Sequence, residues 1–264
     1  MTNSASLIIN QPNHLTGEIL IPGDKSITHR AIMLGSLSNG RLDIKNGLLS
    51  EDCKKTIDAF IMLGVDITIN DMTVSINGNG LNSLKPPSSI IDAGNSGTLA
   101  RLISGVLAVQ NFNSSISGDC SLIQRPMQRI IDPLTEAGAN ISSNNNLMPL
   151  SFMQSTRLKV INYTSQIPSA QIKSCLILAS LFLDGKSTIK EAVKTRDHTE
   201  RMLQFLDYPI AIDDKTILVD GNGSIAAKDI EIPSDISSAA FLIVGAIIKP
   251  DSNITLKSIG INPL

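Results

Sequence analysis

The sequence has few aromatic residues, little charge and little cysteine. It contains no tryptophan, 3% aromatic and 17% charged residues over 264 positions, whereas 42% of its residues are hydrophobic. This aliphatic composition excludes the collagenous, coiled-coil and disordered classes, and the length is enough to bury a sizeable core. We therefore expect a soluble globular protein of one to two domains.

An excess of charge of one sign is also absent. The 22 lysines and arginines nearly balance the 24 aspartates and glutamates, for a net charge of −2. Without a global positive field, nucleic-acid binding is not expected. Cys53, Cys120 and Cys175 lie far apart, without metal-ligand spacing or a disulfide framework. We interpret them as small core residues in a reducing compartment.

Long hydrophobic runs are missing as well. The first ten residues contain neither a basic stretch nor an apolar run of signal-peptide length, which predicts a cytoplasmic protein. The longest apolar run, residues 239–248, is about half of the length that a membrane-spanning helix needs. It predicts a buried helix, and no membrane partner is expected.

One order of elements recurs three times, with the copies starting about 72 residues apart. Each copy opens with an aliphatic helix, predicted over 27–37, 94–109 and 168–183. A second, more polar helix follows in each copy, over 50–64, 125–138 and 195–206. Two short alternating runs then predict a hairpin, as in 65–69 and 72–76, and in 209–212 and 215–219.

The second helices carry recognisable start and stop signals. Ser50 and Thr195 are interpreted as N-caps, and Pro126 suits a first helical position. Gly64 and Gly138 stand where a left-handed residue is expected to end a helix.

A unit of strand, helix, strand, helix and hairpin cannot bury its own sheet, so three copies should pack their helices inward around a pseudo-threefold axis. This predicts an α/β fold in which residues 18–228 form one complete three-repeat domain. Residues 1–17, with a strand-like run at 7–9, and residues 229–264 are expected to form part of a second domain. We expect the chain to be a fragment of something larger, which associates through this partial domain.

The starts of the first helices are rich in Gly, Ser and Thr, together with basic or amide side chains. Such turns present free backbone N–H groups and the positive end of a helix to an anion, so three of them near one axis predict a phosphate-binding cleft. The candidate groups are Lys25, Ser26, Thr28 and Arg30; Gly94, Asn95, Ser96, Gly97, Thr98 and Arg101; Ser169, Gln171 and Lys173; and Arg125 and Arg196 at the second helices.

Each of these turns taken alone is ordinarily a cap, and a lone basic residue there is ordinarily solvated. Their coincidence at five helix starts, in a chain with 22 lysines and arginines, favours binding. A P-loop is not expected, because Asp24 separates Gly23 from the lysine. A metal site is not expected either, because His29 and His198 lack further ligands at fixed offsets.

Five segments resemble those of a known family. Residues 22–30, Pro-Gly-Asp-Lys-Ser-Ile-Thr-His-Arg, are similar to the N-terminal signature of the 5-enolpyruvylshikimate-3-phosphate synthase family, class II branch. Four further segments match it in order, at 94–101, 118–127, 169–174 and 195–200. The resemblance implies two inside-out, barrel-like α/β domains, each of three βαβαββ repeats, that close on their substrates.

The resemblance also implies a reaction. The enolpyruvyl group of phosphoenolpyruvate is transferred to the 5-hydroxyl of shikimate 3-phosphate, with release of phosphate, on the pathway to chorismate and aromatic amino acids. The implied partners are these two small molecules, and no metal or organic cofactor is implied. Charge neutralisation and positioning of two polyanions would supply much of the rate.

Residue roles follow from the same resemblance, with Lys25 implied to reach both substrates. The implied ligands of shikimate 3-phosphate are Lys25, Ser26, Arg30, Ser169, Ala170, Gln171 and Arg196. The implied ligands of phosphoenolpyruvate are Lys25, Asn95, Gly97, Thr98, Arg125 and Gln171. In the family a methyl group at the position of Gly97 crowds the herbicide glyphosate, so this glycine implies that this route to resistance is absent.

Two departures from the family pattern stand out. Ser234 replaces a glycine beside an aspartate, with Ile236 two places on, and family members are much longer than this chain. The resemblance places the aspartate that deprotonates the 5-hydroxyl in the part beyond residue 264, so we expect substrate binding with poor turnover or none.

Two alternatives remain open. UDP-N-acetylglucosamine enolpyruvyl transferases are related, but they lack the Lys-Ser-x-x-x-Arg pattern of residues 25–30, and the surroundings of Cys120 do not resemble their reactive loop. A phosphate-binding module without catalysis is the second alternative. It is disfavoured because such a module would not keep a lone helix at 239–248.

Overall fold

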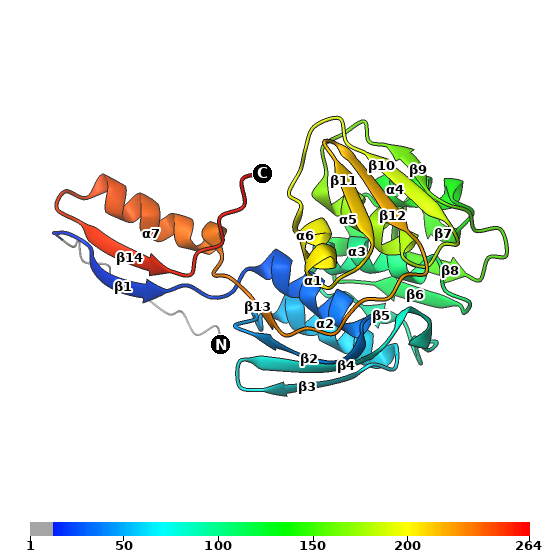
Figure 1. The fold of residues 1–264 in the computed structure, drawn as a ribbon, viewed down its shortest axis with the longest axis horizontal. Coiled ribbons are helices and arrows are strands. Elements are labelled where there is room, and N and C mark those ends of the chain that lie inside the picture. The colour runs from blue at the N-terminus through cyan, green and yellow to red at the C-terminus, as the bar shows by residue number, and fades with distance from the viewer. Residues whose placement is uncertain (1–12) are drawn as a thin grey trace, which may run out of the picture.

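The computed structural model describes residues 13–264. Three aliphatic helices form the middle of its larger part, and sheets surround them (Figure 1). They are α1 (Lys25–Ser36), α3 (Gly97–Leu107) and α5 (Ala170–Ser180), and most of their residues are buried. Each helix is capped by the side chain of the residue before it, which accepts a hydrogen bond from the backbone N–H three positions later. The capping residues are Asp24, Ser96 and Ser169. The three predicted first helices are thereby confirmed.

Three four-stranded sheets share one strand order, in which the first pair is parallel and the other two pairs are antiparallel. No sheet closes into a barrel among residues 13–264. The first sheet contains β13 (Ile230–Glu231), β2 (Asn39–Lys45), β4 (Thr73–Asn79) and β3 (Asp66–Asn70). The second contains β5 (Ile91–Asp92), β6 (Ser114–Ser117), β8 (Leu147–Met153) and β7 (Asn140–Asn144). The third contains β9 (Asn162–Thr164), β10 (Lys186–Lys190), β12 (Thr216–Asp220) and β11 (Ile210–Asp213).

The second helices are α2 (Glu51–Met62), α4 (Gln128–Glu136) and α6 (His198–Phe205), and short 3₁₀ turns lie at Leu81–Ser83 and Leu122–Gln124. Gly64 and Gly138 follow α2 and α4 with φ of 89° and 94°, which confirms the predicted left-handed ends.

Two of the three expected helix starts differ from the structure. Thr195 is not an N-cap, because its hydroxyl donates to Glu191 and Asp197 occupies the N-cap position of α6. Pro126 is not a first helical residue, because α4 begins only at Gln128. Ser50 does stand at the N-cap position of α2, but its side chain makes no capping hydrogen bond.

A smaller part projects from the three sheets (Figure 1). In it β1 (Thr16–Leu20) pairs in parallel with β14 (Asn253–Lys257), and α7 (Ile236–Ile248) packs beside them. The strand pairing therefore places residues 18–20 with the smaller part, whereas β13 extends the first sheet of the larger part. The strand expected at residues 7–9 lies outside the described residues.

Helix α7 is not the buried helix that its apolar run predicts. Ala239 is its one buried residue, while the side chains of Phe241 and Ile247 are 85% and 77% exposed. A two-stranded sheet covers only one side of a helix, so the apolar residues on the other sides face solvent. None of the helices within residues 13–264 combines the length and apolarity needed to cross a lipid bilayer.

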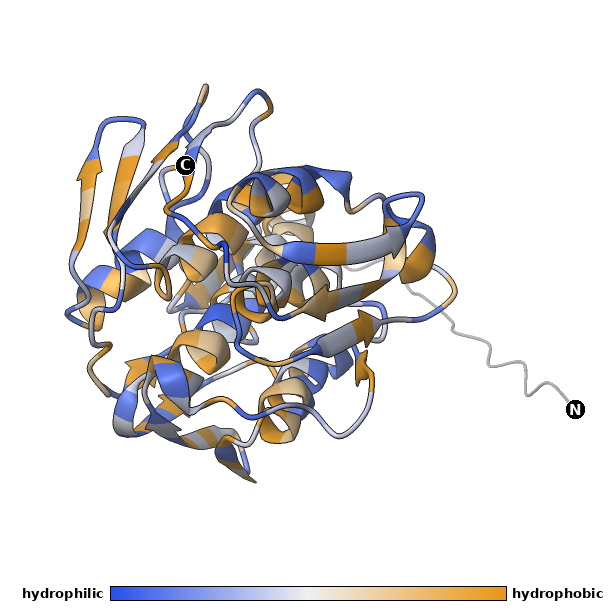
Figure 2. Ribbon diagram, turned by 90° about the vertical axis from the view of Figure 1, so that its right-hand side faces the viewer, coloured by the Kyte–Doolittle hydropathy of each residue, from blue (hydrophilic) through white to orange (hydrophobic). Residues whose placement is uncertain are grey.

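The central helices pack closely because small residues face one another. A Cβ added to Gly105 of α3 would lie 2.1 Å from the carbonyl oxygen of Cys175 on α5. Cys53 and Cys175 are buried as expected, but Cys120 is exposed, so it is not a core residue. Hydrophobic residues recur along the helices and alternate with hydrophilic ones along the strands (Figure 2).

Candidate functional site

Side-chain hydrogen bonds join the N-terminal turns of the three central helices. Gln171 at the start of α5 donates from Nε2 to Thr98 Oγ1 on α3 at 3.3 Å, and Arg101 Nη1 donates to Gln171 Oε1 at 3.0 Å. Arg30 of α1 donates from Nη2 to Ser174 Oγ of α5 at 2.8 Å. The N-terminal ends of α1, α3 and α5 therefore lie next to one another, which is the arrangement that favours an anion.

At the start of α3, a chain of polar contacts holds an arginine in place. Arg125 Nη2 donates to Asn95 Oδ1 at 2.6 Å, and Asn95 Nδ2 donates to Asp119 Oδ2 at 2.7 Å. The hydrogen bond from Asn95 is the main cause that lowers the pKa of Asp119 below its ordinary value. Asp119 also accepts the N–H of Leu122 at 2.8 Å, so this carboxylate fixes the turn that precedes Arg125.

Positive charge gathers around Gly97, the first residue of α3. A Cβ at this position would lie 3.0 Å from Arg101 Nη1 and 3.2 Å from Arg125 Nη1. Burial, and then the charges of Arg125 and Arg129, lower the pKa of Arg101. Neither Arg101 nor Arg125 forms an ion pair with a carboxylate among residues 13–264, so this group of guanidiniums is an environment that an anion would stabilise.

At the start of α1, one cation is exposed and one is buried. The side chain of Lys25 is 47% exposed, and its Nζ lies 3.3 Å from Asp52 Oδ2. Arg30 is 5% exposed, and its hydrogen bonds to Ser26 O, Thr199 Oγ1 and Ser174 Oγ use three of its five N–H donors. Burial is the main cause that lowers the pKa of Arg30 to about 10.

The start of α5 and the loop before α6 complete the candidate site. Ser169 caps α5, and Ala170 and Gln171 are half-buried beside it. Arg196 is exposed and borders a cavity of about 240 Å³, which Asp24, His198 and the end of the chain also line. That end contacts α6 through Asn262 Nδ2, which donates to Asp197 Oδ1 at 2.8 Å.

Lys173 does not join the candidate site, contrary to the sequence-based expectation. Its side chain is 3% exposed, and its Nζ lies 2.8 Å from Glu191 Oε2 and 2.7 Å from Glu200 Oε1. Its Nζ also donates to the carbonyl oxygen of Thr195 at 3.1 Å, so its three N–H donors are used within the protein and none is left for a ligand. No sequence motif pointed to a role for either glutamate, although a lysine and a serine inside an aliphatic helix, Lys173-Ser174, are a signal of buried polar partners.

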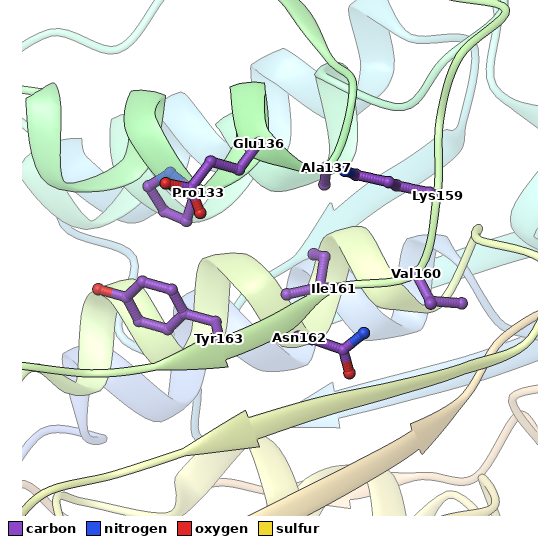
Figure 3. Close-up of a pocket in the computed structure, with 8 residues that line it drawn as sticks. All are labelled: Pro133, Glu136, Ala137, Lys159, Val160, Ile161, Asn162 and Tyr163. Carbon is purple, nitrogen blue, oxygen red and sulfur yellow. The ribbon is translucent and has the colours of Figure 1, made fainter.

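A separate cavity of about 210 Å³ lies between the end of α4 and strand β9 (Figure 3). Pro133 and Glu136 face Lys159 and Tyr163 across it, and none of the candidate residues lines it. Among residues 13–264, no group of three or more His, Cys, Asp or Glu side chains gathers where it could hold a metal ion.

The family model that matches this chain and two similar proteins carry the same name. The family model "EPSP synthase (3-phosphoshikimate 1-carboxyvinyltransferase)" matches residues 9–264. The 3-phosphoshikimate 1-carboxyvinyltransferase of Endomicrobium trichonymphae is 47% identical over 257 residues, which cover 97% of this chain and 60% of that protein. That of Ruthia magnifica is 48% identical over 259 residues, covering 98% of this chain and 60% of that protein.

A solved structure agrees with these relatives. The EPSP synthase from Acinetobacter baumannii superposes with a TM-score of 0.89 at 41% identity, covering 95% of this chain and 57% of that one. The chain thus spans about 60% of the length of the curated relatives it matches. With a matching model over residues 9–264, and the expected motifs gathered at three helix ends, the chain belongs to the EPSP synthase family.

Proposed function

We propose that this chain is the shikimate 3-phosphate-binding lobe of an enolpyruvyl transferase. In a complete protein, this lobe would hold shikimate 3-phosphate while its 5-hydroxyl attacks the enol carbon of phosphoenolpyruvate, and phosphate would leave. The proposal rests on family membership and on the shared names of the relatives, 3-phosphoshikimate 1-carboxyvinyltransferase.

One observation carries the proposal: three capped helix N-termini meet, with Arg101 and Arg125 around one of them and Lys25 and Arg30 at another. Backbone N–H groups and guanidinium forks suit phosphate and carboxylate oxygens, and both proposed substrates carry these groups. In a closed site, fixed positive groups also stabilise the charge that develops during transfer.

The proposed ligands divide between the two substrates. Those of shikimate 3-phosphate are Lys25, Ser26, Arg30, Ser169, Ala170, Gln171 and Arg196. Those of phosphoenolpyruvate are Lys25, Asn95, Gly97, Thr98, Arg125 and Gln171. Gln171 is assigned to both because its amide bonds to Thr98 and Arg101 on α3 while its backbone belongs to the start of α5.

Lys25 would act by position and charge rather than as the base. Its Nζ lies 3.3 Å from Asp52 Oδ2, and its side chain is exposed. An exposed ion pair contributes little stability, so the flexible lysine side chain can turn from Asp52 toward a phosphate or carboxylate group of a substrate. We assign no residue of this chain to deprotonation of the 5-hydroxyl, and we expect that group in the part of the relatives that this chain does not span. Substrate binding with little or no turnover follows.

We further propose that the three sheets are three copies of one βαβαββ unit and make up one domain. Their common strand order and the buried helices between them support this inside-out arrangement. The sequence bounds this domain at residues 18–228, and we propose limits of 21–231 instead, because β1 pairs with β14 and β13 pairs with β2. Strands β1 and β14 and helix α7 would then belong to a second domain of the same kind.

The proposed function is tested by a phosphate-release assay combined with calorimetric titration. We expect shikimate 3-phosphate to bind, and phosphate release to stay at background when phosphoenolpyruvate is added. Lys25→Ala should weaken the binding, whereas Lys186→Ala, on an exposed strand end, should not. Rapid turnover would contradict the assignment of the base to the missing part, and binding that is insensitive to Lys25→Ala would contradict the site.

A further inference from the structure

A buried group of charges lies beneath the candidate site. Lys173 on α5 contacts Glu191, which follows β10, and Glu200 in the first turn of α6. The exposed fractions of these three side chains are 3%, 7% and 2%. Desolvating isolated charges costs several kcal/mol for each, so these groups are stable only as a set.

This set holds one residue, Thr195, from both sides. Glu191 Oε1 accepts the N–H of Thr195 at 3.2 Å and also its hydroxyl, while Lys173 Nζ donates to the carbonyl oxygen of Thr195 at 3.1 Å. The carbonyl of Thr195 belongs to the peptide bond that leads into Arg196. The backbone in front of Arg196 is therefore fixed by buried ionic groups, although Arg196 itself is exposed.

The next residues along the chain are fixed as well. Thr199 accepts a hydrogen bond from Arg30 Nε at 2.7 Å and donates to Ser174 Oγ at 2.7 Å. Glu200, the residue after Thr199, forms an ion pair with Lys173. Arg196 thus lies between two anchored points, Thr195 before it and the first turn of α6 after it.

Anchoring matters here because Arg196 and Arg30 repel one another. Burial is the main cause that lowers the pKa of Arg30; Glu200 raises this pKa, and the positive charge of Arg196 lowers it further. Arg30 is buried and held by three hydrogen bonds, so Arg196, which is exposed, is the arginine whose side chain this repulsion would displace in the absence of a ligand. A fixed backbone limits that movement and keeps the guanidinium ready for an anion.

We propose that Lys173, Glu191 and Glu200 are positioning residues that hold Arg196 toward the phosphate group of the ligand. They touch no substrate and act only through the loop from Glu191 to Asp197. The inference rests on the proposed function, because it takes Arg196 as a ligand of the 3-phosphate. It extends that function by assigning the basis of phosphate selectivity to a buried set of charges.

The test compares shikimate 3-phosphate with shikimate, which lacks the phosphate, by calorimetric titration of the 264-residue chain. Glu191→Gln preserves the side-chain shape, and Glu136→Gln, on the exposed end of α4, is the matched control. We expect Glu191→Gln to weaken shikimate 3-phosphate binding about tenfold and to leave shikimate binding unchanged. An equal loss for both ligands, or no loss, would overturn the inference.

Non-additivity separates positioning from a general loss of structure. In an Arg196→Ala background, the residue through which the positioning acts is gone, so Glu191→Gln should change shikimate 3-phosphate affinity by less than about twofold. If the effects of the two substitutions multiply, Glu191 does not act through Arg196. A wild-type chain that binds neither ligand contradicts the proposed function instead.

Amide hydrogen exchange tests the anchoring without any ligand. The N–H of Thr195 should exchange at least tenfold faster in Glu191→Gln than in the wild type, and it should be unchanged in Glu136→Gln. Equal exchange in all three proteins overturns the inference whatever the titrations show. If Glu191→Gln does not fold, Thr195→Val removes only the hydroxyl donor, and the titrations with both ligands are repeated on it with the same expected selectivity.

Discussion

Arg30 Nε donates to Thr199 Oγ1 at 2.7 Å across 169 positions of sequence. This contact joins the motif at residues 22–30 to the motif at 195–200, and the same guanidinium reaches Ser174 in the motif at 169–174. Three of the five family segments therefore meet at one buried side chain. The site and the core are built from the same residues at this point.

Replacing this guanidinium should affect folding and binding together. Arg30→Lys keeps the charge, but an ammonium cannot reach Ser26 O, Thr199 and Ser174 in the geometry of the fork. We expect a loss of about 2 kcal/mol in the free energy of unfolding, measured with urea, and weaker shikimate 3-phosphate binding. Arg41→Lys, at a largely exposed arginine, is the control that should change neither.

His29 should make stability depend on pH. The imidazole is fully buried, and its Nδ1 lies 2.7 Å from Thr56 Oγ1. Its Nε2 has no hydrogen-bond partner among the described residues. Burial is the main cause that lowers the pKa of His29 from 6.5 to about 4. Between these two pH values the unfolded chain binds a proton that the folded chain does not. The free energy of unfolding therefore falls as the pH drops from 6.5 to about 4, by up to about 3 kcal/mol from this group.

Urea unfolding at several pH values measures this effect against His29→Gln, in which position 29 cannot titrate. The difference between the two profiles, rather than either profile alone, isolates His29 from the carboxylates that titrate in the same range. We expect the wild type to lose more stability than the variant on acidification. Parallel profiles would show that His29 becomes protonated without cost in the folded chain.

Gly97 should be more important for ligand binding than for folding. An added Cβ would crowd the ends of two arginine side chains, at 3.0 Å for Arg101 and 3.2 Å for Arg125, and these ends can move. Its third neighbour, Leu122 Cδ1 at 3.9 Å, is at an ordinary contact distance. We expect Gly97→Ala to keep the unfolding free energy within about 1 kcal/mol. In the presence of shikimate 3-phosphate, it should weaken binding of glyphosate, which calorimetry can measure. Equal glyphosate binding by both proteins would contradict the proposed position of this subsite.

The exposed face of α7 should cause the chain to associate. Phe241, Ile247 and Ile248 are 85%, 77% and 71% exposed on one helix, and large apolar side chains that are exposed together ordinarily mark an interaction surface. We expect the weight-average mass in sedimentation experiments to rise with concentration. The double substitution Phe241→Ser and Ile247→Ser should restore a monomer. A wild-type chain that stays monomeric at all concentrations would favour the alternative of a self-sufficient phosphate-binding module.

The sequence predicted the starts of the central helices and the ends of α2 and α4 well because their signals are local. Gly64 and Gly138 mark helix ends by their own backbone preference, and the caps at Ser96 and Ser169 lie next to the helices that they start. Strand β13 could not be found in this way. It has two residues, and its partner β2 lies almost two hundred positions earlier, so only tertiary pairing defines it.

The sequence predicted which residues lie near the helix starts of the candidate site, but not which of them are buried. The motifs placed Lys25 and Gln171 correctly at helix starts, because a helix start follows from nearby residues. Arg125 does not open α4 as expected, because that helix begins three residues later, at Gln128. The sequence alone does not tell an exposed lysine from one that faces two buried glutamates, and Lys173 was therefore assigned to the wrong role. Burial depends on how α5, α6 and β10 pack, and this information is spread over the whole chain.

Calorimetric titration of shikimate 3-phosphate into the wild-type chain tests the central claim most directly. We predict binding at one site, which Arg196→Ala weakens strongly and which inorganic phosphate alone does not reproduce at equal concentration. The absence of binding heat at several temperatures, or binding that Arg196→Ala leaves unchanged, would contradict the claim that these three helix ends and the loop before α6 form the shikimate 3-phosphate site.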